Sequence, residues 1–247
     1  MPAIVEPDFA IVIPARFASS RFPGKPLAPI LGKPMIRRVW ERCVEAVPPE
    51  RVYVATDDER IRAACMEFGA RVLMTSSDCL TGTDRVAAAA LALRHAFIVN
   101  VQGDEPMLDP TDIISVARAH SEHPSAVTNA MSPIDNEADY LSRNVPKVVA
   151  APDGRLLYMS RAPLPADKSG AFRGAHRQVC IYAFAREHLV RFAACPSKTP
   201  IEAIEDIEIL RFLELGIEVR MVMLRSGSLS VDTPQDLERV EHALRGG

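Results

Sequence analysis

Residues 9–32, FAIVIPARFASSRFPGKPLAPILG, join a short apolar run to a proline-rich loop that carries three cations. Residues 9–13 are rich in β-branched side chains and end at Pro14, so they are predicted to form a buried strand. Further prolines are expected to exclude regular structure until a helix begins near Lys33. Arg16, Arg21 and Lys25 then lie on a stiff loop at the carboxyl end of a strand, the edge where open α/β sheets bind ligands.

Phosphate binding is one function that this loop could serve. Backbone N–H groups around Ser19, Ser20 and Gly24 could hold phosphate oxygens beside fixed positive charge. Taken alone, the segment is better explained as an ordinary surface loop with solvated cations. Its interpretation therefore depends on the segments that follow.

Composition limits the class of protein. The chain has 247 residues, of which 48% are hydrophobic and 25% charged, and a formal net charge of −3, which argues against nucleic acid as a partner. The N-terminus resembles no signal peptide and no apolar run reaches the ~20 residues of a membrane span, so we expect a cytoplasmic protein without membrane insertion. The five cysteines include no CxxC pair, which favours buried, reduced thiols.

Apolar runs and amphipathic stretches alternate along the first half of the chain. This pattern predicts an α/β, Rossmann-like fold with a mostly parallel central sheet and helices on both faces. We expect strands at 9–13, 51–56, 71–74, 96–101 and 218–224, and helices at 34–46, 58–68, 83–94, 110–122, 202–215 and from 234. A smaller mixed β segment at about 126–200, with strands at 126–131, 147–151, 156–160 and 178–184, is expected within a single domain covering 1–247.

Two carboxylates follow predicted strands. Asp104 lies in NVQGDEP (100–106), and Asp232 lies in SVDTP (230–234). Mg²⁺ is commonly held by one or two carboxylates together with substrate phosphates, so the pair would form a coherent metal site if the fold brings them together. The alternatives are a turn residue for Asp104 and a helix N-cap for Asp232.

The segment TGTDR (81–85) is a glycine-containing turn before an alanine-rich stretch. Its hydroxyl and backbone groups could bind a base or ribose, and its threonines or Asp84 could cap the following helix. The two roles are compatible.

Six segments together resemble the 3-deoxy-manno-octulosonate (Kdo) cytidylyltransferase family, in order and spacing, over most of the chain. They are IPARFASSRFPGKPL (13–27), VATDDERI (54–61), MTSSDCLTGTDR (74–85), NVQGDEP (100–106), YMSRAPLP (158–165) and VDTPQDLERV (231–240). The resemblance implies a nucleotidyltransferase that moves a cytidylyl group from CTP to the anomeric hydroxyl of an acidic sugar. Pyrophosphate would leave, Mg²⁺ would be the cofactor, and the product would serve lipopolysaccharide or capsule synthesis.

The resemblance also implies roles for individual residues. Arg16, Lys25 and Asp104 would be catalytic, and Asp104 with Asp232 would hold Mg²⁺. The nucleotide would be bound by Ala15, Arg16, Ser19, Arg21, Lys25, Thr81, Gly82, Thr83, Arg85 and Gln102. The acidic sugar would be bound by Arg161, Gln178, Tyr182 and Glu208, and the segment 126–200 would form a homodimer.

The expected sugar pocket departs from the family pattern at two positions. Gln178 stands where the family usually carries a histidine, and Ile209 stands where it carries a glutamine. We therefore hypothesise a modified or different acidic acceptor, with neutral drift at Gln178 and a core position for Ile209 as the alternative. A non-Kdo hydroxy acid as acceptor and a catalytically silent nucleotide-binding protein are further alternatives.

The late helix predicts one further feature. Glu202, Glu205, Glu208 and Arg211 are spaced by three residues. Such spacing places them on one stripe of the helix, which would ordinarily face solvent. Because Glu208 matches a pocket residue of the family, we expect the stripe to face the sugar cleft or a dimer partner.

Overall fold

The computed structural model describes residues 7–18, 22–225 and 229–246 and contains a large mixed sheet. Its main strands run in the order β11-β7-β10-β6-β1-β4-β5, and β8 and β9 extend it beside β10. Their bounds are β1 Phe9–Ala15, β4 Val52–Thr56, β5 Arg71–Met74, β6 Phe97–Val101, β7 Val127–Ile134, β8 Lys147–Ala150, β9 Leu156–Ser160, β10 Ala175–Ala185 and β11 Val219–Met223. The pairs β1–β4, β1–β6, β4–β5 and β11–β7 are parallel, whereas β10 is antiparallel to β6, β7 and β8.

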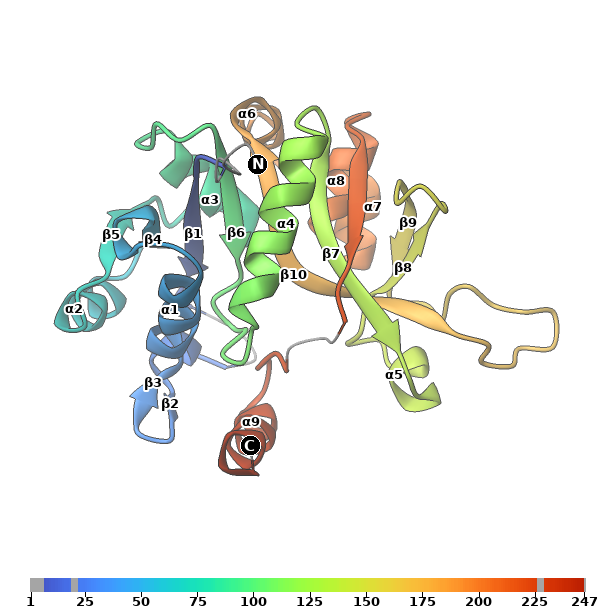
Figure 1. Ribbon diagram of the computed structural model, residues 1–247, viewed down its shortest axis with the longest axis horizontal. Coiled ribbons are helices and arrows are strands. Elements are labelled where there is room, and N and C mark those ends of the chain that lie inside the picture. The colour runs from blue at the N-terminus through green and yellow to red at the C-terminus, as the bar shows by residue number, and fades with distance from the viewer. Residues whose placement is uncertain (1–6, 19–21, 226–228, 247) are drawn as a thin grey trace, which may run out of the picture.

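Helices cover both faces of this sheet (Figure 1). One face is covered by α1 Met35–Ala46, α2 Glu59–Glu67 and α4 Pro110–Glu122, and the other by α3 Gly82–Ala90, α6 Arg186–Ala193 and α8 Ile209–Glu214. The remaining helices are α5 Glu137–Leu141, α7 Pro200–Glu205 and α9 Pro234–Gly246. This arrangement confirms the predicted α/β fold, in which a mostly parallel sheet has helices on both faces. Among the described helices none is long and apolar enough to span a bilayer.

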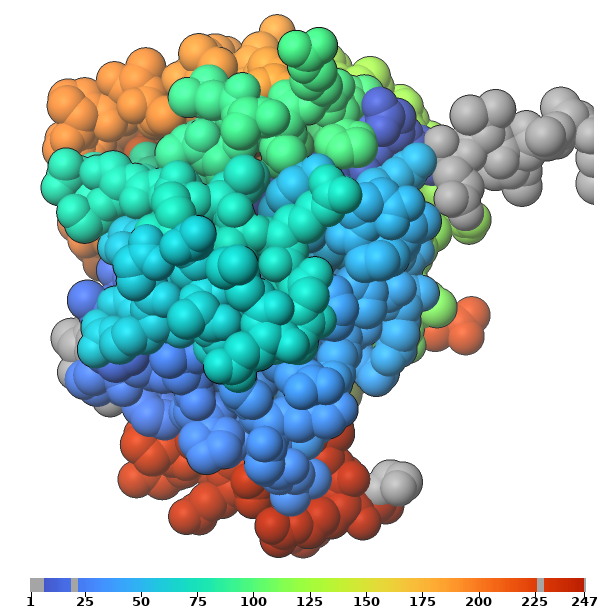
Figure 2. Space-filling model, turned by 90° about the vertical axis from the view of Figure 1, so that its left-hand side faces the viewer, coloured from blue at the N-terminus to red at the C-terminus, as the bar shows by residue number. Residues whose placement is uncertain are grey.

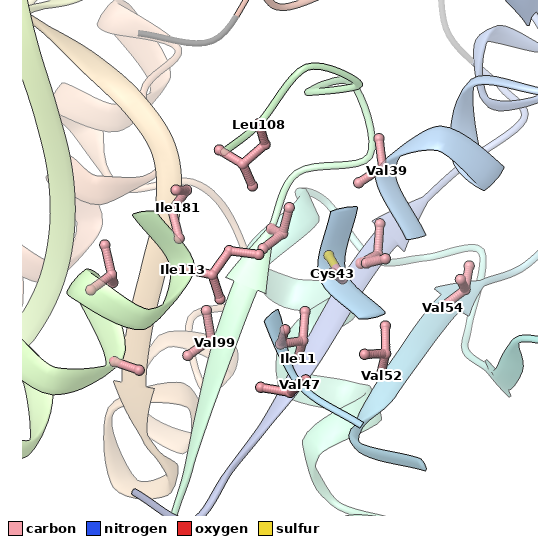
Figure 3. Close-up of a cluster of buried hydrophobic side chains, with 14 of the residues drawn as sticks. Ile11, Val39, Cys43, Val47, Val52, Val54, Val99, Leu108, Ile113 and Ile181 are labelled. Atoms are coloured by element: carbon pink, nitrogen blue, oxygen red, sulfur yellow. The ribbon is translucent and has the colours of Figure 1, made fainter. Parts of the chain in front are cut away.

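The hydrophobic core follows from the period of the sequence. Along β1 every side chain is buried, with Ile11 and Ile13 on the α1 face and Ala10 and Val12 on the α3 face. Figure 3 shows the first of these layers, where Val39 and Cys43 of α1 and Ile113 of α4 meet the sheet. Burial on both faces explains why the strands appear as continuous apolar runs.

The hairpin of β2 (Pro29–Ile30) and β3 (Lys33–Pro34) packs with α9 in a small cluster separate from the main core. Ile30 and Met35 pack with Val231 and Val240 in this cluster. In Figure 2, α9 lies directly below the blue hairpin segment, and the Leu31 amide donates to Glu241 at 2.9 Å. The loop after β1 is thereby held against the last helix.

Several predicted boundaries differ from the structure. The first strand continues through Pro14 to Ala15, because its parallel neighbour supplies partners on either side of the proline. The prolines after it do not exclude regular structure. A short 3-10 turn covers Lys25–Leu27, and strands β2 and β3 cover Pro29–Ile30 and Lys33–Pro34.

The predicted helix 202–215 is two helices. Asp206 adopts the left-handed conformation (φ 52°) that ends α7, a backbone state that aspartate tolerates better than most residues. Helices α5 and α6 were not predicted. β10 runs directly into α6 without a glycine or proline at the junction, so the sequence carries no boundary signal there.

All five cysteines are free, as predicted, but only two of them are buried. Cys43 and Cys65 lie in the core between α1, α2 and the sheet. Cys79, Cys180 and Cys195 are partly exposed.

Candidate active site

A cavity of about 320 Å³ opens where the loops after β1 and β6 meet the β8–β10 region. Of the predicted site residues that the structure describes, all except Thr83 line it: Ala15, Arg16, Lys25, Thr81, Gly82, Arg85, Gln102, Asp104, Arg161, Gln178, Tyr182, Glu208 and Asp232. Ser19 and Arg21 lie outside the described residues. We call Arg16, Lys25, Gln102, Asp104 and Asp232 the strand-exit residues, and Asn144, Val145, Arg161, Gln178 and Tyr182 the hairpin residues.

Lys25 joins the two carboxylates that the sequence singled out. Its Nζ lies 2.8 Å from Asp104 Oδ2 and 3.5 Å from Asp232 Oδ1, and it also donates to the Val231 carbonyl at 2.8 Å. The Val231 amide donates to the Asp104 carbonyl at 2.9 Å, which fixes the two loops side by side. Burial favours the neutral amine, but the two carboxylates outweigh it and raise the pKa of Lys25. The ammonium is therefore retained at neutral pH.

Two carboxylates around one cation are also a suitable ligand set for Mg²⁺. Both Asp104 and Asp232 lie within 3.5 Å of a single positive atom, so a divalent ion could take oxygens from each. Within the described residues no group of three or more His, Cys, Asp and Glu gathers as a self-sufficient metal site. An ion held by these two carboxylates would have further positions open to substrate oxygens.

Asp232 lies two residues before Pro234, the first residue of α9. Asp236 Oδ2 accepts from the Asp232 amide at 3.1 Å and from the Thr233 amide at 2.9 Å. The Asp236 side chain, in the first turn of α9, thus reaches back to the backbone that precedes the helix.

A glycine allows the loop after β6 to approach β1. A Cβ built on Gly103 would lie 2.8 Å from the Pro14 carbonyl oxygen, closer than real Cβ contacts allow. The backbone between Gln102 and Asp104 can therefore pass directly over the end of β1, beside Ala15 and Arg16. This contact brings the NVQGDEP segment to the cationic loop.

The turn 81–85 begins α3 and caps it. Thr81 Oγ1 accepts from the Asp84 amide at 3.2 Å and donates to Asp84 Oδ2 at 2.7 Å. At Gly82 a Cβ would lie 3.0 Å from the Gln102 side-chain nitrogen. The predicted capping role is therefore present, and the turn also packs on Gln102 at the cavity wall.

Arg85 is held below this turn. Its side chain is 3% exposed, forms an ion pair with Asp57 at 3.1 Å and donates to Thr75 Oγ1 at 2.5 Å. Asp57 directly follows β4, so Arg85 ties the start of α3 to a second strand exit.

Glu208 directs its carboxylate at the start of α3. Oε1 accepts from the Gly82 amide at 3.1 Å, and Oε2 accepts from the Thr83 amide at 2.8 Å and the Thr83 hydroxyl at 2.5 Å. Burial raises the pKa of Glu208, while the bonds from Thr83 and Gly82 oppose that shift. Although Glu208 lines the cavity, its observed contacts hold the 81–85 turn.

The expected single stripe of residues 202, 205, 208 and 211 does not exist, because the helix breaks at Asp206. Arg211 is fully buried and bonds both oxygens of Glu202, at 2.6 and 2.7 Å, and Asp84 at 2.9 Å. Glu205 instead accepts from the Ser160 hydroxyl at 2.5 Å and the Arg161 amide at 2.9 Å. These side chains connect α7 and α8 to α3 and β9 within the chain.

Gln178 and Tyr182 meet because β10 contains a bulge. The register to β7 shifts between Val179 and Tyr182, and Gln178 Nε2 donates to the Tyr182 hydroxyl and to Asn129 Oδ1, both at 3.1 Å. Burial raises the pKa of Tyr182 well above its usual range, so the phenol stays protonated. His176 and Gln178 both pair with β7 before the register shifts. The bulge therefore does not bring the His176 imidazole to the position of Gln178, where the family usually carries a histidine.

The guanidinium of Arg161 donates hydrogen bonds to backbone carbonyls. Nε donates to Glu205 O at 2.6 Å, and the two terminal nitrogens donate to Arg143 O at 3.0 Å and Asp206 O at 2.9 Å. Since arginine has five N–H donors, two remain for a ligand in the cavity that Arg161 lines.

The expected pocket role of the 209 position is not seen. Ile209 is 1% exposed and packs in the core with Leu210 and Phe212, and it does not line the cavity. The alternative interpretation of Ile209 as a core residue is therefore confirmed.

The cavity also has walls that the sequence did not single out. They include Glu105, Asn144, Val145, Arg177, Cys180, Lys198 and Asp206. Glu105, Arg177 and Cys180 lie within two residues of predicted site residues in the sequence, and this proximity could have indicated them. Asp206 lies at the break between α7 and α8, and Lys198, which precedes α7, forms an ion pair with it.

Comparison with known proteins gives a consistent family. A family model described as Cytidylyltransferase matches residues 10–220. Proteins named 3-deoxy-manno-octulosonate cytidylyltransferase are similar over nearly their whole length. The relative from Syntrophotalea carbinolica is 46% identical, covering 95% of this chain and 98% of its own, and that from Geobacter sulfurreducens is 44% identical, covering 96% and 100%.

Solved structures agree with this likeness. A CMP:2-keto-3-deoxy-manno-octonic acid synthetase complexed with CTP has a TM-score of 0.89 at 34% identity, covering 97% of this chain and 99% of its own. A cytidylyltransferase from Leptospira borgpetersenii has a TM-score of 0.64 at 17% identity, covering 98% of this chain and 88% of its own, and shows a shared fold only.

Proposed function

The chain belongs to the 3-deoxy-manno-octulosonate cytidylyltransferase family and is a nucleotidyltransferase, and on this premise we propose that it makes CMP-Kdo from CTP and Kdo. The anomeric hydroxyl of the acceptor forms a bond to the α-phosphorus of CTP and loses its proton to solvent, and pyrophosphate leaves. The observation that carries the proposal is the Lys25–Asp104–Asp232 cluster in one cavity with the 81–85 turn and Arg161.

The strand-exit residues suit the triphosphate. Arg16 and the ammonium of Lys25 would neutralise charge on the phosphate oxygens, which is the main requirement of phosphoryl transfer. Asp104 and Asp232 would hold Mg²⁺, which supplies further charge neutralisation and lowers the pKa of a bound hydroxyl. Gln102 and the turn 81–85 would contact the cytidine and ribose.

The hairpin residues suit an acidic sugar. Arg161 retains two N–H donors for a carboxylate, a bidentate geometry that guanidinium provides and lysine does not. The Gln178 amide and the Tyr182 hydroxyl would contact sugar hydroxyls. Because Ile209 is a core residue, Gln178 remains as the departure that bears on the acceptor.

A panel of acceptors tests the proposal. Pyrophosphate release from CTP and Mg²⁺ would be measured with Kdo and with related 3-deoxy-ulosonic acids, and we expect Kdo to give the highest kcat/KM. A different preferred acid would support the modified-acceptor hypothesis that Gln178 suggests. Pyrophosphate release with none of them, despite CTP binding, would indicate a silent nucleotide-binding protein.

The setting of the reaction follows from the same premise. We propose that the product supplies lipopolysaccharide or capsule synthesis from the cytoplasm. We also propose that the enzyme is a homodimer formed through residues 126–200. Sedimentation equilibrium of the purified chain would test the dimer, and a monomer at assay concentration would exclude it.

A further inference from the structure

Lys147, the first residue of β8, is fully buried and carries an ammonium group with an unusual set of partners. Its Nζ donates to the carbonyls of Ser142 at 2.7 Å, Val145 at 2.6 Å and Arg161 at 2.8 Å. These three bonds use all the donors of the ammonium. Over the described part of the chain Lys147 forms no ion pair within 4 Å, so backbone oxygens alone compensate its burial directly.

Such an arrangement has a cost that an apolar side chain would avoid. Removing a charge from water is expensive, and carbonyl oxygens repay it only when the geometry is fixed. Burial, followed by the nearby charge of Arg161, lowers the pKa of Lys147, while Glu205 opposes that shift. The ammonium therefore has a role beyond filling the core.

The three carbonyls belong to two walls of the cavity. Ser142 and Val145 bound the segment between α5 and β8, in which Asn144, Val145 and Pro146 line the cavity. Arg161 follows β9, whose last residue pairs with Lys147, and it also lines the cavity. One ammonium thus ties both walls together.

The guanidinium of Arg161 completes the connection from the opposite direction. It donates to the Arg143 carbonyl in the same segment, and to the carbonyls of Glu205 and Asp206. Arg161 likewise forms no ion pair within 4 Å among the residues described. Both cations are therefore held by backbone carbonyl dipoles, and their contacts join the segment 142–146 to the end of β9 and to the break between α7 and α8.

We propose that Lys147 is a positioning residue for the acidic acceptor. It fixes the backbone of Arg161 and the segment 142–146 so that the remaining guanidinium donors of Arg161 meet the acceptor carboxylate. The inference rests on the proposed function and adds a residue that does not itself line the cavity.

Steady-state kinetics of Lys147→Met tests this role. We expect the KM for Kdo to rise about tenfold or more, because small displacements of positioning groups are costly, with the KM for CTP and kcat changed less than about threefold. Lys147→Arg should recover part of the loss, since guanidinium can also donate to the carbonyls. Lys168→Met, on an exposed part of the chain, is the matched control and should leave every constant unchanged.

Equal rises in both KM values, or an unchanged KM for Kdo, would overturn the proposal. Calorimetric binding of CTP with Mg²⁺ to each variant shows whether it is folded and whether the nucleotide part of the proposed function holds. If the wild type binds CTP but does not turn over Kdo, the proposed acceptor fails independently of Lys147.

Hydrogen exchange of the wild-type protein supplies a second measurement that needs no variant. The amides of Asn144 and Val145 donate to the Ser142 hydroxyl and the Ser142 carbonyl, both at 3.3 Å, and they should be protected in the ligand-free protein because Lys147 holds the segment that forms these bonds. Exchange at the rate of an unstructured loop, with protection arising only on addition of Kdo, would contradict the positioning role.

Discussion

The strand-exit residues lie in loops that follow β1, β6 and β11, whereas the hairpin residues depend on the antiparallel β8–β9–β10 region and on the break between α7 and α8. At the strand exits, opposite charges pair directly, as Lys25 does with Asp104. At the hairpin, Lys147 and Arg161 are held by carbonyl oxygens instead. On the proposed function, the strand-exit residues would hold the metal-bound triphosphate, and the hairpin residues would hold the single carboxylate of the acceptor.

Asp104→Asn should show the largest effect and tests the strand-exit part alone. The substitution keeps the shape but removes a charge from the proposed metal site, so kcat should fall about 10²–10³-fold. CTP affinity and the KM for Kdo should change far less, which stopped-flow binding and initial rates would measure. Asp135→Asn, an exposed position, is the control. Unchanged turnover would remove Asp104 from the mechanism.

At acidic pH, protonation of His120 should destabilise strand β7, which supports the hairpin residues. Burial, with His188 adding to it, lowers the pKa of His120 to about 4, and His120 lies 3.2 Å from Thr128 of β7, next to Asn129. Its folded pKa is below the unfolded value of about 6.5, so its contribution to stability is complete above that pH and is lost as the pH falls toward 4.

The slope of unfolding free energy against pH measures this effect. Between about pH 6 and 4.5, His120→Gln should reduce the slope by up to about 1.4 kcal/mol per pH unit relative to wild type. Urea unfolding at several pH values gives the slope, with the exposed His242→Gln as control. An identical slope in His120→Gln would show that another group is responsible.

Gly103→Ala would disturb the contact between the two strand exits. Its Cβ must displace the Pro14 carbonyl, so we expect a loss of about 1–3 kcal/mol in unfolding free energy and a raised KM for CTP. Gly246→Ala, where a Cβ meets nothing within 4 Å, is the control. A fully stable, fully active Gly103→Ala would show that the loop can move without consequence.

Glu208→Gln decides to which part of the site this side chain belongs. Its contacts to Gly82 and Thr83 predict that the KM for CTP rises, by about tenfold, while the KM for Kdo changes less. Glu187→Gln, at an exposed side chain, is the comparison variant. A rise confined to the KM for Kdo would instead place Glu208 with the acceptor hydroxyls, as the family resemblance implies.

The same division explains what the sequence could predict. Asp104 and Asp232 are recognisable because each follows an apolar run, and parallel strands bring their carboxyl ends to one edge. The meeting of Gln178 with Tyr182 requires the β10 bulge, and the separate roles of Glu202, Glu205 and Glu208 require the left-handed Asp206. Neither the bulge nor the left-handed residue leaves a periodic pattern in the sequence.

Lys147 shows most clearly what the sequence alone does not predict. In the sequence it begins a predicted strand, where a lysine is normally a solvated end residue. Its burial and its three carbonyl partners arise from the packing of the α5–β8 segment against the end of β9. Such a residue becomes visible only when long-range contacts are known.

The coupling of CTP consumption to an acidic sugar is the central claim, and phosphorus-31 NMR of the wild-type protein with CTP, Mg²⁺ and Kdo tests it most directly. We predict that the phosphodiester resonance of CMP-Kdo and the resonance of pyrophosphate grow together, and only when Kdo is present. After the two phosphorus atoms of pyrophosphate are taken into account, the two products should form in equal molar amounts. CTP that stays intact with Kdo, or that is cleaved to CMP and pyrophosphate equally well without it, would contradict the account.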